Sequence, residues 1–223
     1  LPLDEHVLPA GYQQVEYVAS GSGQYVDTGI KGKSGLECRM KMMPKKVSSS
    51  DDCGYLGARQ GSNNRAYLVY NYQGKWTYGY ANTWSNSGFP SIVVDRLYDI
   101  YAKICPGDQQ LVVDGDPVFK KTASGSFTLN CNVWIFALNY DGSPKTSSAQ
   151  CYSLQMWDQG VLVRDYVPCY SAADGAYGLY DFCGTEKRFY MSGTKTGLSG
   201  PDLVATDRAL NVASTDDESA TLA

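Results

Sequence analysis

The chain has 223 residues and a formal net charge of −4, and a chain of this length can bury roughly 70% of its unfolded surface in one large domain or two small ones. The acidic balance leaves no basic stripe to displace counterions from phosphates, which argues against nucleic-acid binding. No segment approaches the ~20 apolar residues of a membrane helix, so we expect no membrane insertion. The chain opens at Leu1 without a basic or apolar leader, and we expect a processed product or an excised segment.

Cysteine is frequent for a protein of this size, with seven residues at positions 38, 53, 105, 131, 151, 169 and 183. No two of them form a C-x-x-C pair and the single histidine is His6, so we expect no structural zinc site. Disulfide bonds in an oxidising compartment are the favoured interpretation, with one thiol left over. The alternative is a reduced chain in which several cysteines are buried as small hydrophobic side chains.

Short strands separated by turns account for the pattern in chain order. The chain holds 18 Tyr against 6 Phe and 4 Trp, together with 23 Gly, a mixture that favours strands over helices. The predicted strands are residues 24–30, 36–43, 66–72, 75–80, 96–104, 111–113, 118–120, 133–138, 151–157 and 161–166. Gln73-Gly74 and Asp114-Gly115 predict tight hairpin turns. No segment carries a helical stripe of useful length, so the predicted fold class is all-β.

One predicted strand is apolar on both faces. Residues 133–138 therefore indicate a central strand that an opposing sheet covers. If this strand forms a hairpin with residues 151–157 around a connection at 139–148, Cys131 falls roughly opposite Met156. Cys131 and Cys151 then lie out of register, and a disulfide bond between them is not expected because it needs Cα atoms within about 7 Å of each other.

The two ends of the chain carry its most specific motifs, which are QYVDTG at 24–29, LVRDYVPC at 162–169 and GLYD at 178–181. The looser motifs YLGAR at 55–59 and WIFALN at 134–139 lie between them. Together they resemble the strands of a concanavalin A-like (laminin-G-like) jelly-roll domain, as found in bacterial surface and phage-borne proteins. The resemblance covers residues 8–200 and implies a two-sheet antiparallel jelly-roll β-sandwich. Residues 1–7 are then an N-terminal lead-in, and residues 201–223 a flexible acidic tail or linker, with an arm that orders on a neighbouring subunit as the alternative.

In a jelly roll the terminal strands lie close together, so the fold needs two ends that pair. We expect Arg164 and Asp165 to hold a turn through charge-assisted hydrogen bonds, and Asp181 and Asp27 to have similar structural roles, with ligand binding as the alternative. Cys169 and Cys183 bracket the closing turn and are the first-choice disulfide pair.

The fold also hosts glycoside hydrolases, which need two carboxylates about 5 to 9.5 Å apart. The glu-x-asp-x-x-glu strand of such enzymes is missing here. Asp95 and Asp99, at i and i+4, would be separated by roughly 13 Å on one strand face. A serine or cysteine nucleophile would need His6, which lies outside the recognisable domain. We therefore expect no enzyme activity.

An aromatic cluster on two predicted strands and the following loop is the candidate ligand surface, and comprises Tyr67, Tyr70, Tyr72, Trp76, Tyr78, Tyr80 and Trp84. Trp76, Tyr78 and Tyr80 share one face by strand parity. Trp84 lies with Asn82 in a polar loop, where a flat ring can stack on a sugar while amides bond its hydroxyls. The alternative is that this face packs against the other sheet. We expect Trp84→Ala to weaken glycan binding without lowering stability.

No cofactor is expected, although residues 48–52 and the pair Asp114 and Asp116 could supply oxygen ligands to calcium. Exposed turn carboxylates are the commoner explanation for such residues. The predicted function is non-catalytic recognition of a glycan or cell-surface polysaccharide, by a module that is extracellular, on a cell surface or in a virion. The alternative is a structural subunit of a virion or surface appendage, which uses the sandwich to contact copies of itself or other surface proteins.

Overall fold

The computed structural model describes residues 7–47, 52–185, 188–191 and 197–203. The expected lead-in at 1–7 and the expected tail at 201–223 lie outside the described residues, except for Val7 and residues 201–203. The described chain is all-β, as predicted, and contains no helix long and apolar enough to cross a membrane.

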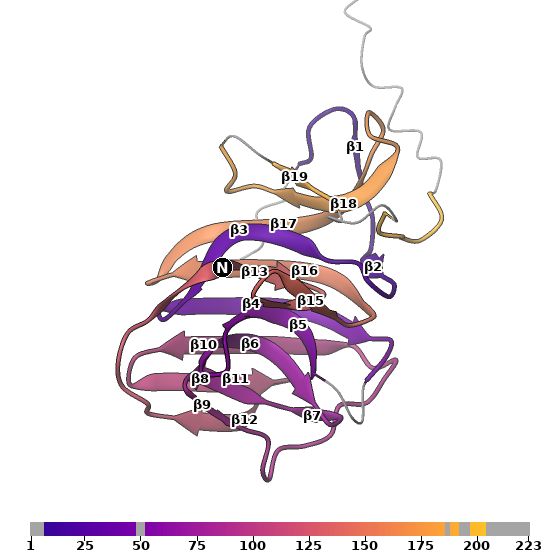
Figure 1. The fold of residues 1–223 in the computed structure, drawn as a ribbon. Coiled ribbons are helices and arrows are strands. Elements are labelled where there is room, and N and C mark those ends of the chain that lie inside the picture. The colour runs from indigo at the N-terminus through magenta and orange to yellow at the C-terminus, as the bar shows by residue number, and fades with distance from the viewer. Residues whose placement is uncertain (1–6, 48–51, 186–187, 192–196, 204–223) are drawn as a thin grey trace, which may run out of the picture.

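The strands form two sheets (Figure 1). Across the ten-stranded sheet the order is β12 (Asp116–Lys121), β11 (Asp108–Val113), β10 (Tyr98–Cys105), β4 (Leu36–Pro44), β16 (Ala149–Asp158), β17 (Val161–Ser171), β18 (Ala176–Asp181) and β19 (Phe189–Tyr190), with β1 (Tyr12–Gln14) on β17 and β2 (Val18–Ser20) on β16. The nine-stranded sheet runs β15 (Ser143–Thr146), β14 (Ala137–Tyr140), β5 (Asp52–Gln60), β6 (Asn64–Tyr72), β8 (Tyr78–Ala81) and β9 (Thr83–Ser85); β13 (Thr128–Ile135) pairs with β5 and β3 (Val26–Lys33), and β7 (Lys75–Trp76) with β6.

The two sheets pack face to face as a sandwich because their strands alternate between apolar and polar side chains. On β10 every second residue is buried, from Tyr98 to Ile104, while the residues between them are only partly buried. Strand β4 shows the same alternation and pairs with β10 in register. Side chains from both sheets meet in one continuous hydrophobic core, which is what the period of two requires of a half-buried strand.

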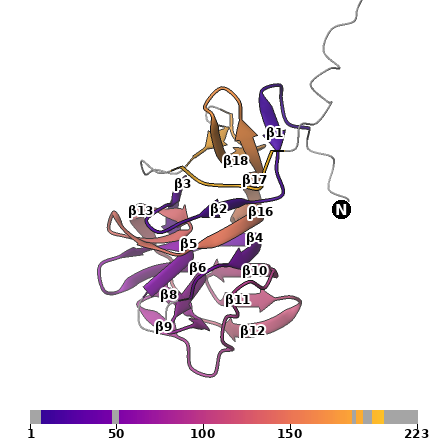
Figure 2. The same cartoon turned by 90° about the vertical axis from the view of Figure 1, so that its right-hand side faces the viewer.

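The two ends of the described chain pair with each other, as the sequence predicts. Tyr12 of β1 lies opposite Ser171 of β17, and β2 pairs with β16. Strand β17 is longer than the predicted 161–166, because its second half is held between β1 and β18. Figures 1 and 2 show β1, β18 and β19 gathered around this second half of β17, beyond the end of the stacked sheets.

Residues 133–138 and 151–157 do not form a hairpin. Phe136 has a φ of 66° and interrupts the apolar run, so that β13 ends before it and β14 begins after it. Strand β14 then pairs with β15 and, in parallel, with β5, whereas β16 belongs to the other sheet. The approach to β5 is close: a Cβ atom on Gly54 would lie 2.2 Å from the backbone nitrogen of Leu138. The sheets are thus antiparallel except where β14 meets β5.

The first-choice disulfide bond is also wrong, because Cys169 and Cys183 are both free thiols. Cys169 lies opposite Gly178 on β18, whereas Cys183 follows the end of β18, next to the residue whose N–H bonds to the carbonyl of Asp165. Four to five residues along a strand separate the two by roughly 13–16 Å, beyond the ~7 Å limit for bridging.

Three of the cysteines that the structure describes, Cys38, Cys151 and Cys169, fit the alternative of buried small side chains, whereas Cys105, Cys131 and Cys183 are partly exposed. Those at 38, 105, 131, 151, 169 and 183 are all free. Burial raises the pKa of Cys38, Cys151 and Cys169 to about 12, so these thiols stay protonated.

Candidate functional site

Three of the predicted ligand-binding aromatic residues lie in the core. Trp76 and Tyr80 are each 1% exposed, and Tyr78 is 4% exposed. The Trp76 ring meets Tyr98 of the opposing sheet edge-on, with ring centroids 5.4 Å apart. Strand parity correctly placed the three on one face, but that face points between the sheets. They are therefore removed from the candidate surface.

Trp84 lies on the outer face of the same sheet. It pairs across the strands with Gly79, which points away from the core because its neighbours Tyr78 and Tyr80 point into it. The Trp84 side chain is 48% exposed, and its ring stands edge-on to Tyr72 with centroids 5.4 Å apart and an interplanar angle of 85°. Asn82 is exposed in the tight turn between β8 and β9. Trp84 and Asn82 are thus the predicted site residues that reach solvent.

Two tyrosines of the predicted cluster lie on the outer face but are covered. Tyr67 and Tyr70 stack with centroids 4.0 Å apart and pack with Leu138 in a cluster separate from the main core. Gly79 makes room for this arrangement, because a Cβ atom there would lie 2.1 Å from the Tyr67 ring. The exposed aromatic surface therefore consists of Trp84 and the partly exposed side chain of Tyr72. We call it the Trp84 surface.

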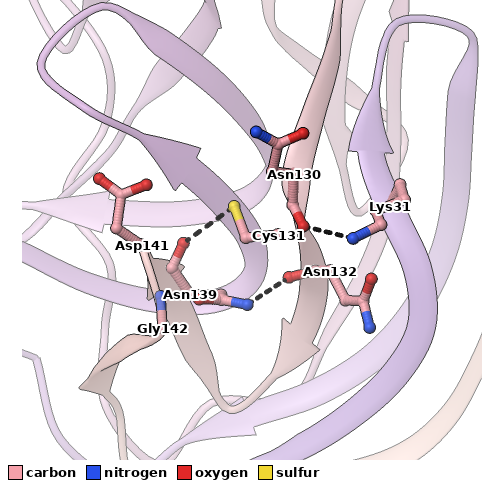
Figure 3. A pocket seen from close by; sticks show the side chains of 7 residues that line it. All are labelled: Lys31, Asn130, Cys131, Asn132, Asn139, Asp141 and Gly142. Carbon is pink, nitrogen blue, oxygen red and sulfur yellow. Dashed lines mark hydrogen bonds between the residues drawn. The ribbon is translucent and has the colours of Figure 1, made fainter.

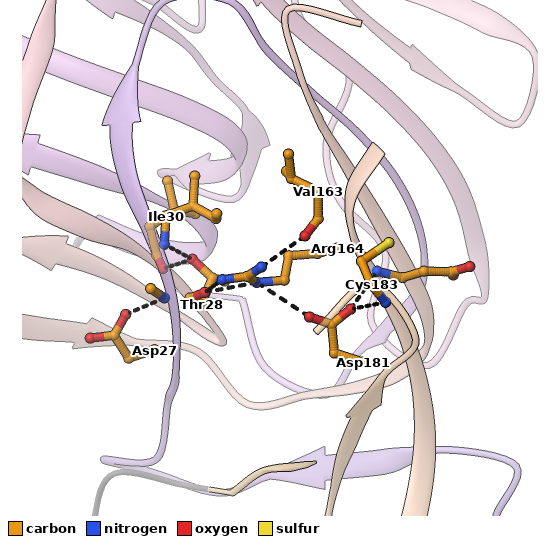
Figure 4. A network of polar contacts seen from close by, with 10 residues as sticks. Asp27, Thr28, Ile30, Val163, Arg164, Asp181 and Cys183 are labelled. Carbon is orange, nitrogen blue, oxygen red and sulfur yellow. Dashed lines mark hydrogen bonds and ion pairs between the residues drawn. The ribbon is translucent and has the colours of Figure 1, made fainter. Parts of the chain in front are cut away.

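The motif residues at the two ends of the chain meet in one polar network (Figure 4). The Arg164 guanidinium on β17 donates from Nε and Nη2 to the carbonyl of Thr28 on β3, at 3.0 and 2.9 Å. Its Nε also lies 3.5 Å from Oδ2 of Asp181. Arg164 thus joins two strands rather than holding a turn, which corrects the predicted role in detail while keeping it structural.

Asp181 is the centre of this network. Its side chain is fully buried, and its Oδ1 accepts hydrogen bonds from the backbone N–H groups of Asp165 at 2.9 Å and Cys183 at 3.0 Å. Burial raises the pKa of Asp181, although these N–H groups and Arg164 oppose the effect. Asp27 has a local role, since its Oδ1 accepts from the N–H of Gly29 and its carboxylate from Asn132.

A polar hollow that the sequence did not predict lies between β13 and the β14–β15 turn (Figure 3). Its lining residues are Lys31, Asn130, Cys131, Asn132, Asn139, Asp141 and Gly142, and its volume is about 400 Å³. We call it the asparagine pocket. The three asparagines at 130, 132 and 139 were a possible signal, but the sequence predicted one strand at 133–138, at whose opposite ends they would lie, whereas the structure divides it into β13 and β14.

The described part of the chain contains no group of three or more His, Cys, Asp or Glu residues able to hold a metal ion. The Asp114 carboxylate is engaged by Arg96 and by the backbone N–H of Asp99, each at 2.8 Å. Of the other predicted oxygen donors, Asp116 is exposed in its turn, and residues 48–51 lie outside the described residues. Asp99 itself pairs with Arg39 at 2.9 Å.

No protein-family model matches this chain, and no curated protein matches it in sequence. What the structure supports is an all-β sandwich of two sheets with a small exposed aromatic surface, a buried polar network and an open polar pocket.

Proposed function

We propose that this chain is a non-catalytic recognition module that binds carbohydrate through the Trp84 surface. The observation that carries the proposal is the 48% exposure of Trp84, edge-on to the partly exposed Tyr72, on a sheet most of whose other aromatic side chains are covered. A tryptophan ring offers a large flat apolar face with one hydrogen-bond donor, a combination that suits the apolar faces of sugar rings. The exposed Asn82 amide lies in the adjoining turn and can bond sugar hydroxyls.

The same proposal includes two further assignments. The fold is a concanavalin A-like jelly roll, and the protein is located outside the cell, on its surface or in a virion. Two features support the jelly-roll assignment. The opening and closing motifs meet through the bonds from Arg164 to Thr28, and β1 and β2 pair with β17 and β16. A jelly roll requires such a meeting of the ends.

The test is a glycan array probed with the purified wild-type chain and with Trp84→Ala. Binding that is specific in the wild type and lost in the variant is the expected result. Trp157→Ala is the matched control, because Trp157 is partly exposed on the outer face of the other sheet. Wild-type binding that survives Trp84→Ala, or no binding to any glycan, would overturn the proposal.

Assembly is the second candidate function, and one observation favours it. Val93, Val94 and Leu97 are all exposed in the connection between β9 and β10. Exposed apolar side chains that lie together are typical of surfaces that contact a partner. A structural subunit would form ordered multimers through this connection, and Val94→Asp would reduce them to monomers in light scattering after gel filtration. A monomer at all concentrations contradicts this candidate.

A further inference from the structure

The asparagine pocket has a rigid frame. The Asn139 side chain is bonded at both ends, with Nδ2 donating to the carbonyl of Asn132 at 2.9 Å and Oδ1 accepting from the N–H of Gly142 at 2.8 Å. Oδ2 of Asp141 accepts from the N–H of Gly61 at 2.7 Å, which fixes the β14–β15 turn against the β5–β6 turn. A site held in this way loses little conformational entropy when it binds a ligand.

Other polar atoms of the pocket keep unused bonding capacity. Within the part of the chain that the structure describes, the side-chain amide of Asn130 and the Oδ1 atoms of Asn132 and Asp141 have no hydrogen-bond partner. Lys31 donates to the carbonyl of Asn130 and retains two further protons. Figure 3 shows Asn130 and Lys31 on one side of the hollow and Asp141 on the other. The pocket thus presents both donors and acceptors from opposite walls.

The charges of the lining residues select the class of ligand. One lysine faces one aspartate, the remaining polar side chains are amides and the Cys131 thiol, and that thiol already bonds two backbone carbonyls, so the formal charge of the lining is zero. An anion would have a single cationic partner and would lie close to Asp141, whereas phosphate sites gather several charge-assisted donors. A single carboxylate is also too few for a hard cation, which takes six or more oxygen ligands. A neutral ligand whose groups both donate and accept fits the pocket best.

Aromatic side chains continue the row of asparagines along β13. Trp134 lies two residues after Asn132, on the same face of the strand, and its ring stacks on Tyr25 with centroids 3.9 Å apart. Trp134 is nearly covered, whereas Tyr25 stays partly exposed. Neither ring lines the pocket itself, whose volume of about 400 Å³ lies within the range of small-ligand sites.

We infer that the asparagine pocket binds a single neutral sugar ring, a hexopyranose whose hydroxyl groups bond Asn130, Asn132 and Asp141. Each hydroxyl both donates and accepts, which matches the mixture of free groups on the two walls. The pocket shares no residue with the Trp84 surface, so this assignment does not rest on the proposed function.

The test is a titration of the isotopically labelled full chain with glucose, mannose, galactose and N-acetylglucosamine in turn, followed by NMR. The expected result is a saturable shift, at millimolar sugar, of the side-chain amides of Asn130 and Asn132 and of the backbone amide of Gly142. Asn130→Ala should weaken this binding about fivefold, the equivalent of one hydrogen bond. Asn63→Ala is the matched control, because Asn63 is an exposed asparagine of the β5–β6 turn that does not line the pocket.

Three outcomes would overturn the assignment. The first is the lack of a saturable shift at the pocket amides with every sugar, and the second is binding that both Asn130→Ala and Asp141→Asn leave unchanged. The third is a stronger saturable response to inorganic phosphate than to any sugar.

The Trp84→Ala variant distinguishes this proposal from the proposed function. Sugar shifts confined to Trp84 and abolished by this substitution would refute the pocket and retain the proposed function, whereas pocket shifts that persist in Trp84→Ala would support the pocket alone.

Discussion

Two clusters of polar residues in this protein each contain an aspartate and a basic side chain. They differ in how much hydrogen-bonding capacity their polar atoms keep for a ligand. The network around Asp181 (Figure 4) is closed to solvent, because its carboxylate is buried. Its Oδ1 accepts from two backbone N–H groups, and its Oδ2, which accepts no hydrogen bond within the described residues, lies 3.5 Å from Nε of Arg164. The asparagine pocket (Figure 3) is open, because its frame uses the Asn139 side chain and leaves the Asn130 amide unbonded within the described residues.

The difference shows how structural polar groups are told apart from ligand-binding ones. A buried polar atom that has all its partners within the chain stabilises the fold and has nothing left to offer a ligand. A polar atom that is fixed in place by its neighbours, but keeps bonding capacity toward solvent, can bind one. The aromatic residues follow the same division: Trp76 is enclosed by the core, and Trp84 keeps almost half of its surface exposed.

The largest effect on stability is expected from removing a buried aromatic side chain, compared with removing an exposed one. Trp76→Ala removes a fully buried ring and leaves a cavity, which should lower the free energy of unfolding by about 3–5 kcal/mol. Trp84→Ala should lower it by less than about 1 kcal/mol, because most of the lost contact is an exposed ring edge. Urea unfolding followed by tyrosine fluorescence and circular dichroism measures both values. Similar losses of stability for the two variants would show that Trp84 is packed into the fold as Trp76 is.

A somewhat smaller loss is expected from opening the closed network. Asp181→Ala leaves the N–H groups of Asp165 and Cys183 buried without an acceptor and takes a partner from Arg164. The free energy of unfolding should fall by about 3 kcal/mol. Asp116→Ala is the control, since Asp116 is an exposed turn aspartate, and should change stability by less than about 0.5 kcal/mol. A loss below about 1 kcal/mol for Asp181→Ala would show that the network contributes little to the fold.

The sequence predicted the local features of the fold because local chemistry determines them. The turns at Gln73-Gly74 and Asp114-Gly115 form as expected, with positive φ at all four residues. The position of β14 could not be predicted. It depends on the positive φ of Phe136 and on the missing Cβ of Gly54, which together allow a parallel pairing between segments ~80 residues apart that no local pattern records.

The candidate sites, like the fold, could be predicted from the sequence only in part. Strand parity tells which residues share a face, as for Trp76 and Tyr80, but only the packing of the sheets decides which face is covered. Trp84 was predicted in a polar loop with Asn82; it lies instead in β9, and its side chain reaches solvent from the outer face of the sheet. The asparagine pocket combines β3, β13 and the β14–β15 turn, and their proximity follows from strand order across the sheet.

Within the pocket itself, two asparagines should differ in their effect on stability. Asn139→Ala removes the bonds that tie the β14–β15 turn to β13 and should cost about 1–2 kcal/mol. Asn130→Ala removes an exposed amide and should cost less than about 0.5 kcal/mol. Thermal and urea unfolding of the two variants side by side measures the difference. If Asn130→Ala were the more destabilising change, the Asn130 side chain would stabilise the fold of the pocket and would not be available to bond a ligand.

The smallest expected effect is the pH dependence that Asp181 gives to the closed network. Because burial raises the pKa of Asp181, the folded chain holds this proton more readily than the unfolded chain, whose aspartates titrate near pH 4. The stabilising contribution of the proton is therefore complete below pH 4 and is lost as the pH rises through the raised pKa. Asp181→Asn cannot ionise and keeps an oxygen for the two N–H groups, so its stability relative to the wild type should increase between pH 4 and pH 7. Urea unfolding at several pH values in this range measures the difference, and a constant or decreasing difference would mean that Arg164 and the N–H groups outweigh burial, so that the network favours the ionised carboxylate.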